Sequence, residues 1–248
     1  MKPVHGELVV VSDAKAFAEY GAHLFAEEAA AAAAARGRFV AGLAGGSTPR
    51  ALYERLAGEP WRDRIDWTCI DLVLGDERFV APDDDKSNVR MIRDALTAHL
   101  PAAPRLHQVP FGGMTVDQAA AAYQQDLAAV HGATSLDPSR PFFDLCLLGM
   151  GDDGHTASLL PGQDDLLAER ERWVLPVTKG RPESRVTLTY PILESARVVV
   201  FLVSGAGKRD MLDRVLSGSD RDVPAARLRP VGRLIWLADR DAAGRWAD

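Results

Sequence analysis

The sequence predicts an α/β protein in which a mostly parallel sheet carries helices on both faces. Short, continuous apolar runs alternate with longer stretches of helical character, and several of these runs end abruptly in glycine-containing turns. Strands that are apolar throughout are typical of parallel sheets, because both of their faces are buried. The composition, with 47% hydrophobic and 26% charged residues, is that of a globular protein.

The first half of the chain supplies elements with recognisable start signals. Ser, Asp and Asn accept hydrogen bonds from the free N–H groups of a helix start, and Pro is favoured at the first helical position. In order, we expect a strand at residues 8–11, a helix at 15–36 capped by Ser12 or Asp13, a strand at 39–44, a helix beginning at Pro49, a strand at 70–74, a helix capped by Ser87 or Asn88 that runs to about His99, and a helix at 116–130.

The second half continues the alternation. The expected elements are a strand at residues 145–148, shorter strand candidates at 173–177 and 186–189, a strand at 198–203 followed by a helix that ends near Leu216, and a last strand at 234–237. No linker-like segment divides the 248 residues, which are enough for one large core. We therefore expect a single domain over residues 1–248.

Charge and cysteine content exclude several classes of protein. The net charge of −6 and the absence of a basic tail argue against nucleic acid as a partner. Cys69 and Cys146 both fall in apolar runs that resemble strands, so we expect buried, free thiols and no metal site. No run approaches the roughly 20 apolar residues of a membrane span, and residues 8–11 are too short for a signal peptide. The expected compartment is the cytoplasm, with no membrane association.

Four of the expected strands end in polar turns that contain glycine. These turns are residues 45–48, 75–78, 149–155 and 204–208. In open α/β sheets, ligands bind beyond the carboxyl ends of the strands. We therefore expect the four turns to converge on one crevice.

The turn formed by Gly45, Gly46, Ser47 and Thr48 joins a strand to a helix. Its glycines allow a ligand to approach the backbone, and its hydroxyls and helix N–H groups favour a phosphate. The alternative is a tight turn with a hydroxyl cap. The lysine of a P-loop and the spacing of a dinucleotide-binding turn are both missing, so a nucleotide site is not predicted.

Two further turns add charges at the same edge of the sheet. Arg78 is a candidate partner for a substrate oxygen, and Asp76 is a candidate to orient a water or hydroxyl; the alternative is a pair of solvated loop charges. Lys208 follows a glycine-rich turn and is a candidate phosphate ligand, as is Arg185 at the start of a strand. The alternative for Lys208 is an exposed side chain at a helix start.

The segment 149–161 is the most specific stretch of the chain. Its glycines, which include Gly151, free the backbone around a single imidazole, that of His155. A histidine with an ordinary pKa can accept a proton at neutral pH, and Asp152 or Asp153 is close enough in sequence to orient it. The alternative is a histidine that caps a helix.

Taken together, these turns resemble the 6-phosphogluconolactonase family over essentially the whole chain. The matching pieces are Gly45-Gly46-Ser47-Thr48-Pro49, Asp76-Glu77-Arg78 with Ser87-Asn88, residues 149–161, Arg185-Val186-Thr187-Leu188-Thr189, and residues 205–208. The resemblance implies hydrolysis of 6-phospho-D-glucono-1,5-lactone in the oxidative pentose phosphate pathway. It also implies a modified Rossmann-like sheet shared with glucosamine-6-phosphate deaminases, His155 as general base, and no metal or organic cofactor.

The resemblance suggests a role for each candidate. His155 would activate a water, Asp152 or Asp153 would orient it, and Arg78 would steady the developing oxyanion or the sugar hydroxyls. The 6-phosphate would be held by Gly46, Ser47, Thr48, Arg185 and Lys208, with Gly45, Asn88 and Gly151 also at the substrate. The expected partner is a small sugar-phosphate lactone, and the expected state is a monomer or a weak homodimer. The loop at residues 81–86 is either a lid or simply solvated.

Two rival functions remain at this point. A glucosamine-6-phosphate deaminase would use a carboxylate shortly after the motif histidine, and residues 156–161 contain none. Arg78 also stands where that family typically has an aromatic residue. A non-catalytic sugar-phosphate sensor could share the sheet and the phosphate turns, although an intact His155 turn favours turnover.

Overall fold

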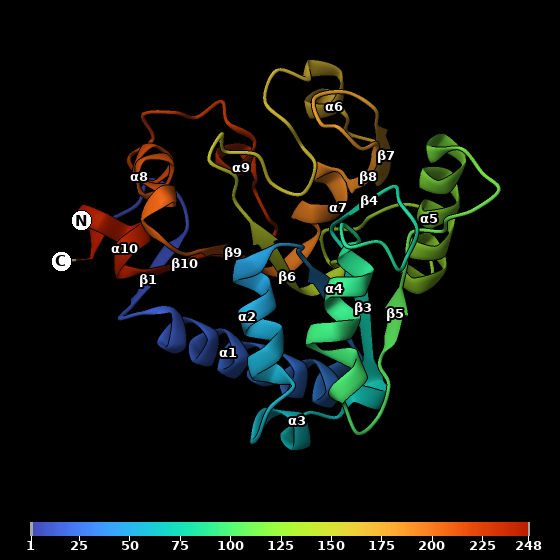
Figure 1. The fold of residues 1–248 in the computed structure, drawn as a ribbon, viewed down its shortest axis with the longest axis horizontal. Coiled ribbons are helices and arrows are strands. Elements are labelled where there is room, and N and C mark those ends of the chain that lie inside the picture. The colour runs from blue at the N-terminus through green and yellow to red at the C-terminus, as the bar shows by residue number, and fades with distance from the viewer. Residues whose placement is uncertain (1, 248) are drawn as a thin grey trace.

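The computed structural model describes residues 2–247, and it contains one large parallel sheet and one small antiparallel sheet (Figure 1). The order of the large sheet is β1-β10-β9-β6-β2-β3-β5, and every neighbouring pair is parallel. Its strands are β1 (Glu7–Val11), β2 (Phe39–Leu43), β3 (Ile70–Leu74), β5 (Arg105–His107), β6 (Phe143–Gly149), β9 (Ala196–Val203) and β10 (Arg233–Asp239).

The small sheet has the order β4-β8-β7 and comprises β4 (Asp76–Arg78), β8 (Arg185–Leu188) and β7 (Val174–Val177). Residues 76–78, which we expected to form a turn, are therefore a short strand. Gly75 connects the two sheets: its N–H donates to the Leu43 carbonyl at 2.9 Å, and its own carbonyl accepts from the Leu188 N–H at 2.9 Å. Gly75 is thus the single residue between β3 of the large sheet and β4 of the small one.

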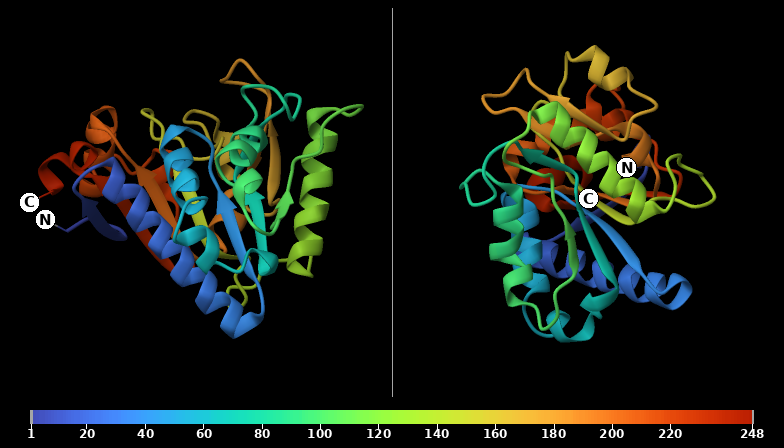
Figure 2. Two further views of the ribbon diagram at one scale, coloured as in Figure 1. Left: turned by 60° about the horizontal axis from the view of Figure 1, so that its bottom comes forward. Right: turned by 90° about the vertical axis from the view of Figure 1, so that its right-hand side faces the viewer.

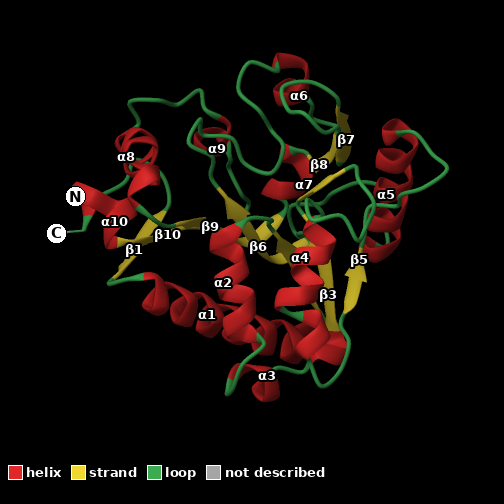
Figure 3. Ribbon diagram, in the orientation of Figure 1, coloured by secondary structure: helices red, strands yellow, loops and turns green. Residues whose placement is uncertain are grey.

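Helices cover the large sheet on both faces, which confirms the predicted fold class (Figures 2 and 3). Figure 1 shows α1 to α4 together on one side, with α5 to α7 and the small sheet on the other. The α-helices are α1 (Ala14–Arg36), α2 (Ser47–Leu56), α3 (Trp61–Arg64), α4 (Asn88–Ala95), α5 (Val116–His131), α6 (Asp164–Ala168), α7 (Tyr190–Glu194), α8 (Arg209–Ser217), α9 (Pro224–Arg227) and α10 (Arg240–Ala243); short 3₁₀ turns are Trp67–Cys69, Thr97–His99, Ala206–Lys208 and Gly244–Trp246.

Two local expectations are corrected. Helix α2 begins at Ser47, so Pro49 is its third residue and not its first. The position is tolerated because the first N–H groups of a helix have no partner within the helix. Cys69 lies in a 3₁₀ turn and is partly exposed, whereas Cys146 is buried in β6 as expected, and both thiols are free.

The predicted caps and the core agree with the structure. Asp13 caps α1 by accepting from the Ala16 N–H at 2.9 Å, and Ser87 caps α4 by accepting from the Arg90 N–H at 3.2 Å. The buried apolar side chains form one cluster that runs from the large sheet into the small one. Within residues 2–247, no helix is long and apolar enough to cross a membrane.

Candidate active site

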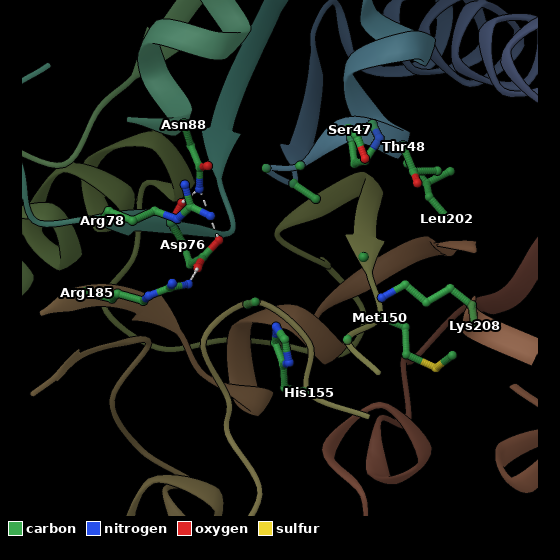
Figure 4. Close-up of a pocket in the computed structure, with 17 residues that line it drawn as sticks. Ser47, Thr48, Asp76, Arg78, Asn88, Met150, His155, Arg185, Leu202 and Lys208 are labelled. Atoms are coloured by element: carbon green, nitrogen blue, oxygen red, sulfur yellow. Dashed lines mark hydrogen bonds and ion pairs between the residues drawn. The ribbon is translucent and has the colours of Figure 1, made fainter. Parts of the chain in front are cut away.

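A pocket of about 250 Å³ opens where the carboxyl ends of β2, β3, β6 and β9 meet (Figure 4). All four polar turns singled out in the sequence contribute to it, so their predicted convergence is confirmed. The lining includes every candidate residue except Asp152 and Asp153. The lining residues are Ala44, Gly45, Gly46, Ser47, Thr48, Pro49, Asp76, Arg78, Asn88, Gly149, Met150, Gly151, His155, Ala157, Arg185, Leu202 and Lys208.

The imidazole of His155 projects into this pocket from the turn that follows β6 (Figure 4). Its Nδ1 lies 2.5 Å from Asp153 Oδ1, and its backbone N–H donates to the same oxygen at 3.1 Å. A carboxylate that accepts from Nδ1 fixes the proton on that nitrogen and leaves the lone pair on Nε2. The arrangement is that of a histidine prepared to accept a proton through Nε2.

Of the two aspartates considered, Asp153 is the one that contacts His155. Partial burial raises the pKa of Asp153, but hydrogen bonds from His155 and Arg181 outweigh it and lower that pKa to about 2. The carboxylate is therefore ionised at neutral pH. Asp152 instead accepts from Lys208 Nζ at 2.5 Å.

Arg181 is a residue that the sequence analysis missed. Its Nη2 donates to Asp153 Oδ2 at 3.0 Å and lies 3.1 Å from His155 Nδ1. Because Nδ1 carries the proton that Asp153 accepts at the shorter distance, the contact of Arg181 with the ring is not a hydrogen bond. Arg181 therefore acts on His155 by holding the far oxygen of Asp153.

Gly151 provides the space for this pair. A Cβ atom on Gly151 would lie 2.0 Å from His155 Nδ1 and 2.6 Å from Asp153 Oδ1, far inside van der Waals contact. The Gly151 N–H also donates to the His155 carbonyl at 2.9 Å, which closes the turn. Glycine is thus required at this position by the geometry of the histidine and the aspartate.

The N-terminus of α2 forms another wall of the pocket. Gly46 is its N-cap residue, with φ of 105°, and it has no side chain to accept from the first N–H groups of the helix. Ser47 and Thr48 begin the helix and line the pocket. Helix N–H groups left without a side-chain cap, together with the positive end of the helix dipole, favour an anion.

Asp76 occupies the carboxyl side of the β3–β4 junction and is buried. It accepts from Ser158 Oγ at 2.5 Å and from Asn88 Nδ2 at 3.3 Å, and it lies 3.6 Å from Arg185 Nη1. Asn88 approaches so closely that a Cβ atom on Gly45 would lie 2.0 Å from its Oδ1. Asp76 therefore connects three elements around the pocket.

Two arginines face each other across the small sheet. Arg78 on β4 is the direct partner of Arg185 on β8 in the antiparallel register. Like charges directly opposite one another destabilise a sheet. The Nε atoms of both side chains are buried and have no hydrogen-bond partner among the described residues. Burial lowers the pKa of Arg185. Arg78 Nη1 donates to the Lys86 carbonyl at 2.6 Å, and Arg185 Nη1 lies 3.6 Å from Asp76. Two guanidinium groups so placed at the pocket favour a bound anion.

The cations of the pocket thus form two groups. Figure 4 shows Arg78 and Arg185 beside Asp76 on one side, Thr48 and Lys208 on the other, and His155 between them. The sequence analysis assigned both Arg185 and Lys208 to the phosphate, and the structure separates them.

Glu77 supports the site from beneath and was also missed. Its carboxylate is buried and accepts from the N–H groups of Asn88 and Val89, each at 2.8 Å. Burial raises the pKa of Glu77, and these hydrogen bonds oppose the rise. Glu77 therefore fixes the start of α4, and with it Asn88. The only sequence signal was an acidic residue ten positions before the helix cap Ser87.

Among the residues 2–247, no group of three His, Cys, Asp or Glu side chains is placed to hold a metal ion. Asp76 is the one carboxylate among the described residues that line the pocket. The position where a deaminase carboxylate would be expected, after His155, instead contains Leu159 and Leu160, which are buried in the core.

Comparison with known proteins identifies the family of the chain. The family model for glucosamine-6-phosphate isomerases/6-phosphogluconolactonase matches residues 12–236. A 6-phosphogluconolactonase from Streptomyces coelicolor is 38% identical over 248 residues, which covers 96% of this chain and 94% of the relative.

Solved structures share the fold over nearly the whole chain. The 6-phosphogluconolactonase from Trypanosoma brucei superposes with a TM-score of 0.79 at 29% identity, covering 97% of this chain and 98% of that one. A monomeric glucosamine-6-phosphate deaminase also superposes with a TM-score of 0.79, covering 96% and 98%. Its identity is 22%, so this likeness concerns the fold alone.

Proposed function

The chain belongs to the glucosamine-6-phosphate isomerase/6-phosphogluconolactonase family, and we propose that it is an enzyme that hydrolyses 6-phospho-D-glucono-1,5-lactone to 6-phospho-D-gluconate. This reaction belongs to the oxidative pentose phosphate pathway. The observation that carries the proposal is His155, held through Nδ1 by Asp153 and directed into a pocket with an anion-binding helix start.

The proposed mechanism needs no protein nucleophile, because a lactone carbonyl is already electrophilic. His155 Nε2 removes a proton from a water as the water oxygen attacks C1 of the lactone. The tetrahedral intermediate then collapses, the bond from C1 to the ring oxygen breaks, and the protonated imidazole returns its proton to that oxygen. Asp153 holds the ring in one tautomer throughout and stabilises the imidazolium.

The 6-phosphate is proposed to lie at the start of α2. Gly46, Ser47 and Thr48 offer N–H and hydroxyl groups there, and Lys208 lies on the same side of the pocket. Lys208 is held by Asp152 at 2.5 Å, which keeps the ammonium group near this wall. Binding energy from the phosphate would position C1 against the water that His155 activates.

Arg78 and Arg185 are proposed to face the other end of the substrate. Both guanidinium side chains line the pocket and are suited to the lactone oxygens, where negative charge develops during attack. Asp76 would position them and Asn88 rather than orient the water, because its carboxylate is already occupied by Ser158, Asn88 and Arg185.

A deaminase is the nearest alternative, and the pocket disfavours it. Proton shuttling in that family uses a second carboxylate near the motif histidine, and Asp76 is the one carboxylate among the described lining residues. Release of ammonia from glucosamine 6-phosphate would support the alternative. Tight binding of the lactone without turnover would support a sensor.

The decisive experiment is the timed hydrolysis of freshly made 6-phosphogluconolactone, with the spontaneous rate subtracted. Loss of a general base lowers the rate by about 10²- to 10⁴-fold. We expect His155→Ala to lower kcat by this factor with little change in KM. His99→Ala is the control, because His99 is exposed and contacts the Asp94 carbonyl. Near-normal kcat in His155→Ala would refute the base assignment.

A further inference from the structure

A second cavity, of about 190 Å³, lies at the amino ends of β2, β6 and β9. Its walls include Arg36, Arg38, Arg140 and Arg197, together with Asp144 and His131, and we call it the arginine cavity. The active-site pocket lies beyond the carboxyl ends of the same strands. Strand β6 has seven residues, so the two cavities are separated by about 20 Å of sheet.

Asp144 is the one carboxylate among the described residues that line the arginine cavity. It is buried and serves two of the arginines, since Oδ1 lies 2.7 Å from Arg36 Nη2 and 3.4 Å from Arg197 Nε. Its other oxygen accepts from the Val40 N–H at 2.9 Å. One negative charge therefore meets two guanidinium groups and has no remaining free oxygen.

The other two arginines sit at the end of α5. Arg38 Nη1 donates to the Val130 carbonyl at 2.9 Å, and Arg140 Nη2 donates to the His131 carbonyl at 2.5 Å. Arg38 Nε is 3.9 Å from Asp71, whose two oxygens are already bound by Arg105 at 2.7 and 2.8 Å. Within residues 2–247, no carboxylate forms an ion pair with Arg140.

The charges of the cavity do not balance. The carboxyl end of a helix carries about half a negative charge, and both α1 and α5 end here, at Arg36 and His131. With Asp144, these helix ends offset about two of the four arginine charges. Asp137 and Glu28, which feel Arg140 and Arg36 from outside the lining, offset part of the rest, and the lining itself keeps a positive excess. The excess is notable in a chain whose net charge is −6.

The His131 ring lies among these charges. Its Nε2 is buried and has no hydrogen-bond partner among the described residues. Burial lowers the pKa of His131, and the charges of Arg140 and Arg38 lower it further, while Asp137 opposes them. The His131 ring also packs against the aromatic rings of Phe142 and Trp173.

We propose that the arginine cavity binds a phosphoryl dianion, either inorganic phosphate or the phosphate of a small phosphomonoester. Guanidinium groups bind phosphate oxygens in paired hydrogen bonds, and an anionic ligand offsets the positive excess of the lining. A concave cavity of this volume suits a compact anion, while the net charge of −6 disfavours a nucleic acid. The inference does not depend on the reaction at the other end of the sheet.

The test is an NMR titration of the His131 ring with inorganic phosphate and, separately, with glucose 6-phosphate. Both are done at constant ionic strength against chloride, in the Lys208→Ala protein, which weakens the active-site phosphate position. We expect saturable shifts and a raised pKa for His131, because a nearby dianion favours the imidazolium. If inorganic phosphate binds more strongly, the cavity selects the free ion; if glucose 6-phosphate does, it selects a phosphomonoester.

The test variant is Arg140→Gln, since Arg140 is exposed and lies far from the catalytic pocket. Loss of one charge-assisted contact should weaken phosphate binding at the cavity by about tenfold or more. The control is Arg221→Gln, because exposed Arg221 also donates to a carbonyl at a helix end, that of Gly218 at 3.3 Å.

With Lys208 intact, an unchanged kcat/KM in Arg140→Gln would show that the fold is retained. Shifts no larger than those caused by chloride, or equal binding in Arg140→Gln, would overturn the proposal.

Discussion

At the scale of single residues, His155 differs from His107, which also contacts carboxylates, in what its second ring nitrogen meets. His107 contacts Asp126 through Nδ1 at 2.8 Å and Asp71 through Nε2 at 2.9 Å, so both nitrogens are occupied. His155 contacts Asp153 through Nδ1, and no described residue binds its Nε2. The contacts of His107 hold strand β5, whereas Nε2 of His155 stays available to accept a proton.

Asp153→Asn tests how strongly catalysis depends on the orientation of His155. The amide cannot stabilise the imidazolium as a carboxylate does, and it permits the opposite tautomer. Loss of a charge-assisted hydrogen bond costs about 1.5–3 kcal/mol, so we expect kcat to fall by about ten- to hundredfold with KM little changed. Steady-state kinetics on the lactone measures both constants.

The neighbouring Asp152→Asn variant is the control for that experiment. Asp152 contacts Lys208 and not His155, so its loss should act mainly on KM. The same fall in kcat in both variants would contradict the assignment of separate roles.

Gly151→Ala tests whether the space beside His155 is required. The added methyl group would lie 2.0 Å from Nδ1, so the ring or the turn must move. Because small misplacements of reacting groups can cost about 10²-fold in rate, we expect a loss of this order in kcat. In Gly58→Ala the nearest atom is 3.6 Å away, and activity should be retained. Full activity in Gly151→Ala would show that the turn accommodates a side chain.

At the scale of elements, the sequence predicted the long strands well and the short ones poorly. Strands β6 and β9 are buried and continuous, and their apolar runs marked them. Strands β4 and β5 have three residues each, too few for any periodicity, and β4 consists of charged residues. The strand pairing that opposes Arg78 and Arg185 was therefore not foreseen.

The same limit applies to the site. Residues in the glycine-rich turns could be identified because a turn after an apolar run is a local pattern. Arg181 lies in an irregular loop 26 residues after His155, and nothing near it in the sequence indicates that contact. Which of Asp152 and Asp153 contacts His155 also depends on the backbone conformation of the turn, and a sequence pattern does not give that.

Strand β5 offers a pH-dependent prediction. The hydrogen bond to Asp71 and the proximity of Asp126 raise the pKa of His107 above its usual value, although burial opposes this. A raised pKa stabilises the folded state fully below the unfolded pKa of about 6.5, and the contribution disappears as the pH rises through the folded pKa. We therefore expect His107→Gln to lower the free energy of unfolding more in mildly acidic than in alkaline solution.

Urea denaturation of the original protein and of His107→Gln, in mildly acidic and in alkaline solution, measures this difference in unfolding free energy. A destabilisation by His107→Gln that grows toward alkaline pH would contradict the proposed ionic contact. His23→Gln is the control, since exposed His23 forms one ion pair, with Glu27 on the same helix at 3.2 Å.

At the scale of the whole molecule, the pocket depends on both sheets at once. Asp76 and Arg185 come from the small sheet, whereas the α2 turn and the His155 turn follow β2 and β6 of the large one. Gly75 joins the sheets through backbone hydrogen bonds, and the apolar core runs through both. A substrate that contacts both walls must therefore stabilise the two sheets together.

This coupling predicts a single unfolding transition, as a single domain over residues 1–248 requires. A ligand at one hundred times its dissociation constant adds about 2.7 kcal/mol of stability. For a chain of this size, each kcal/mol raises Tm by about 2–4 °C, so 6-phosphogluconate should shift the transition by roughly 5–10 °C. Calorimetry with and without the product measures it. Two transitions, of which the ligand moves only one, would show that the sheets unfold separately and that the site is built largely on one of them.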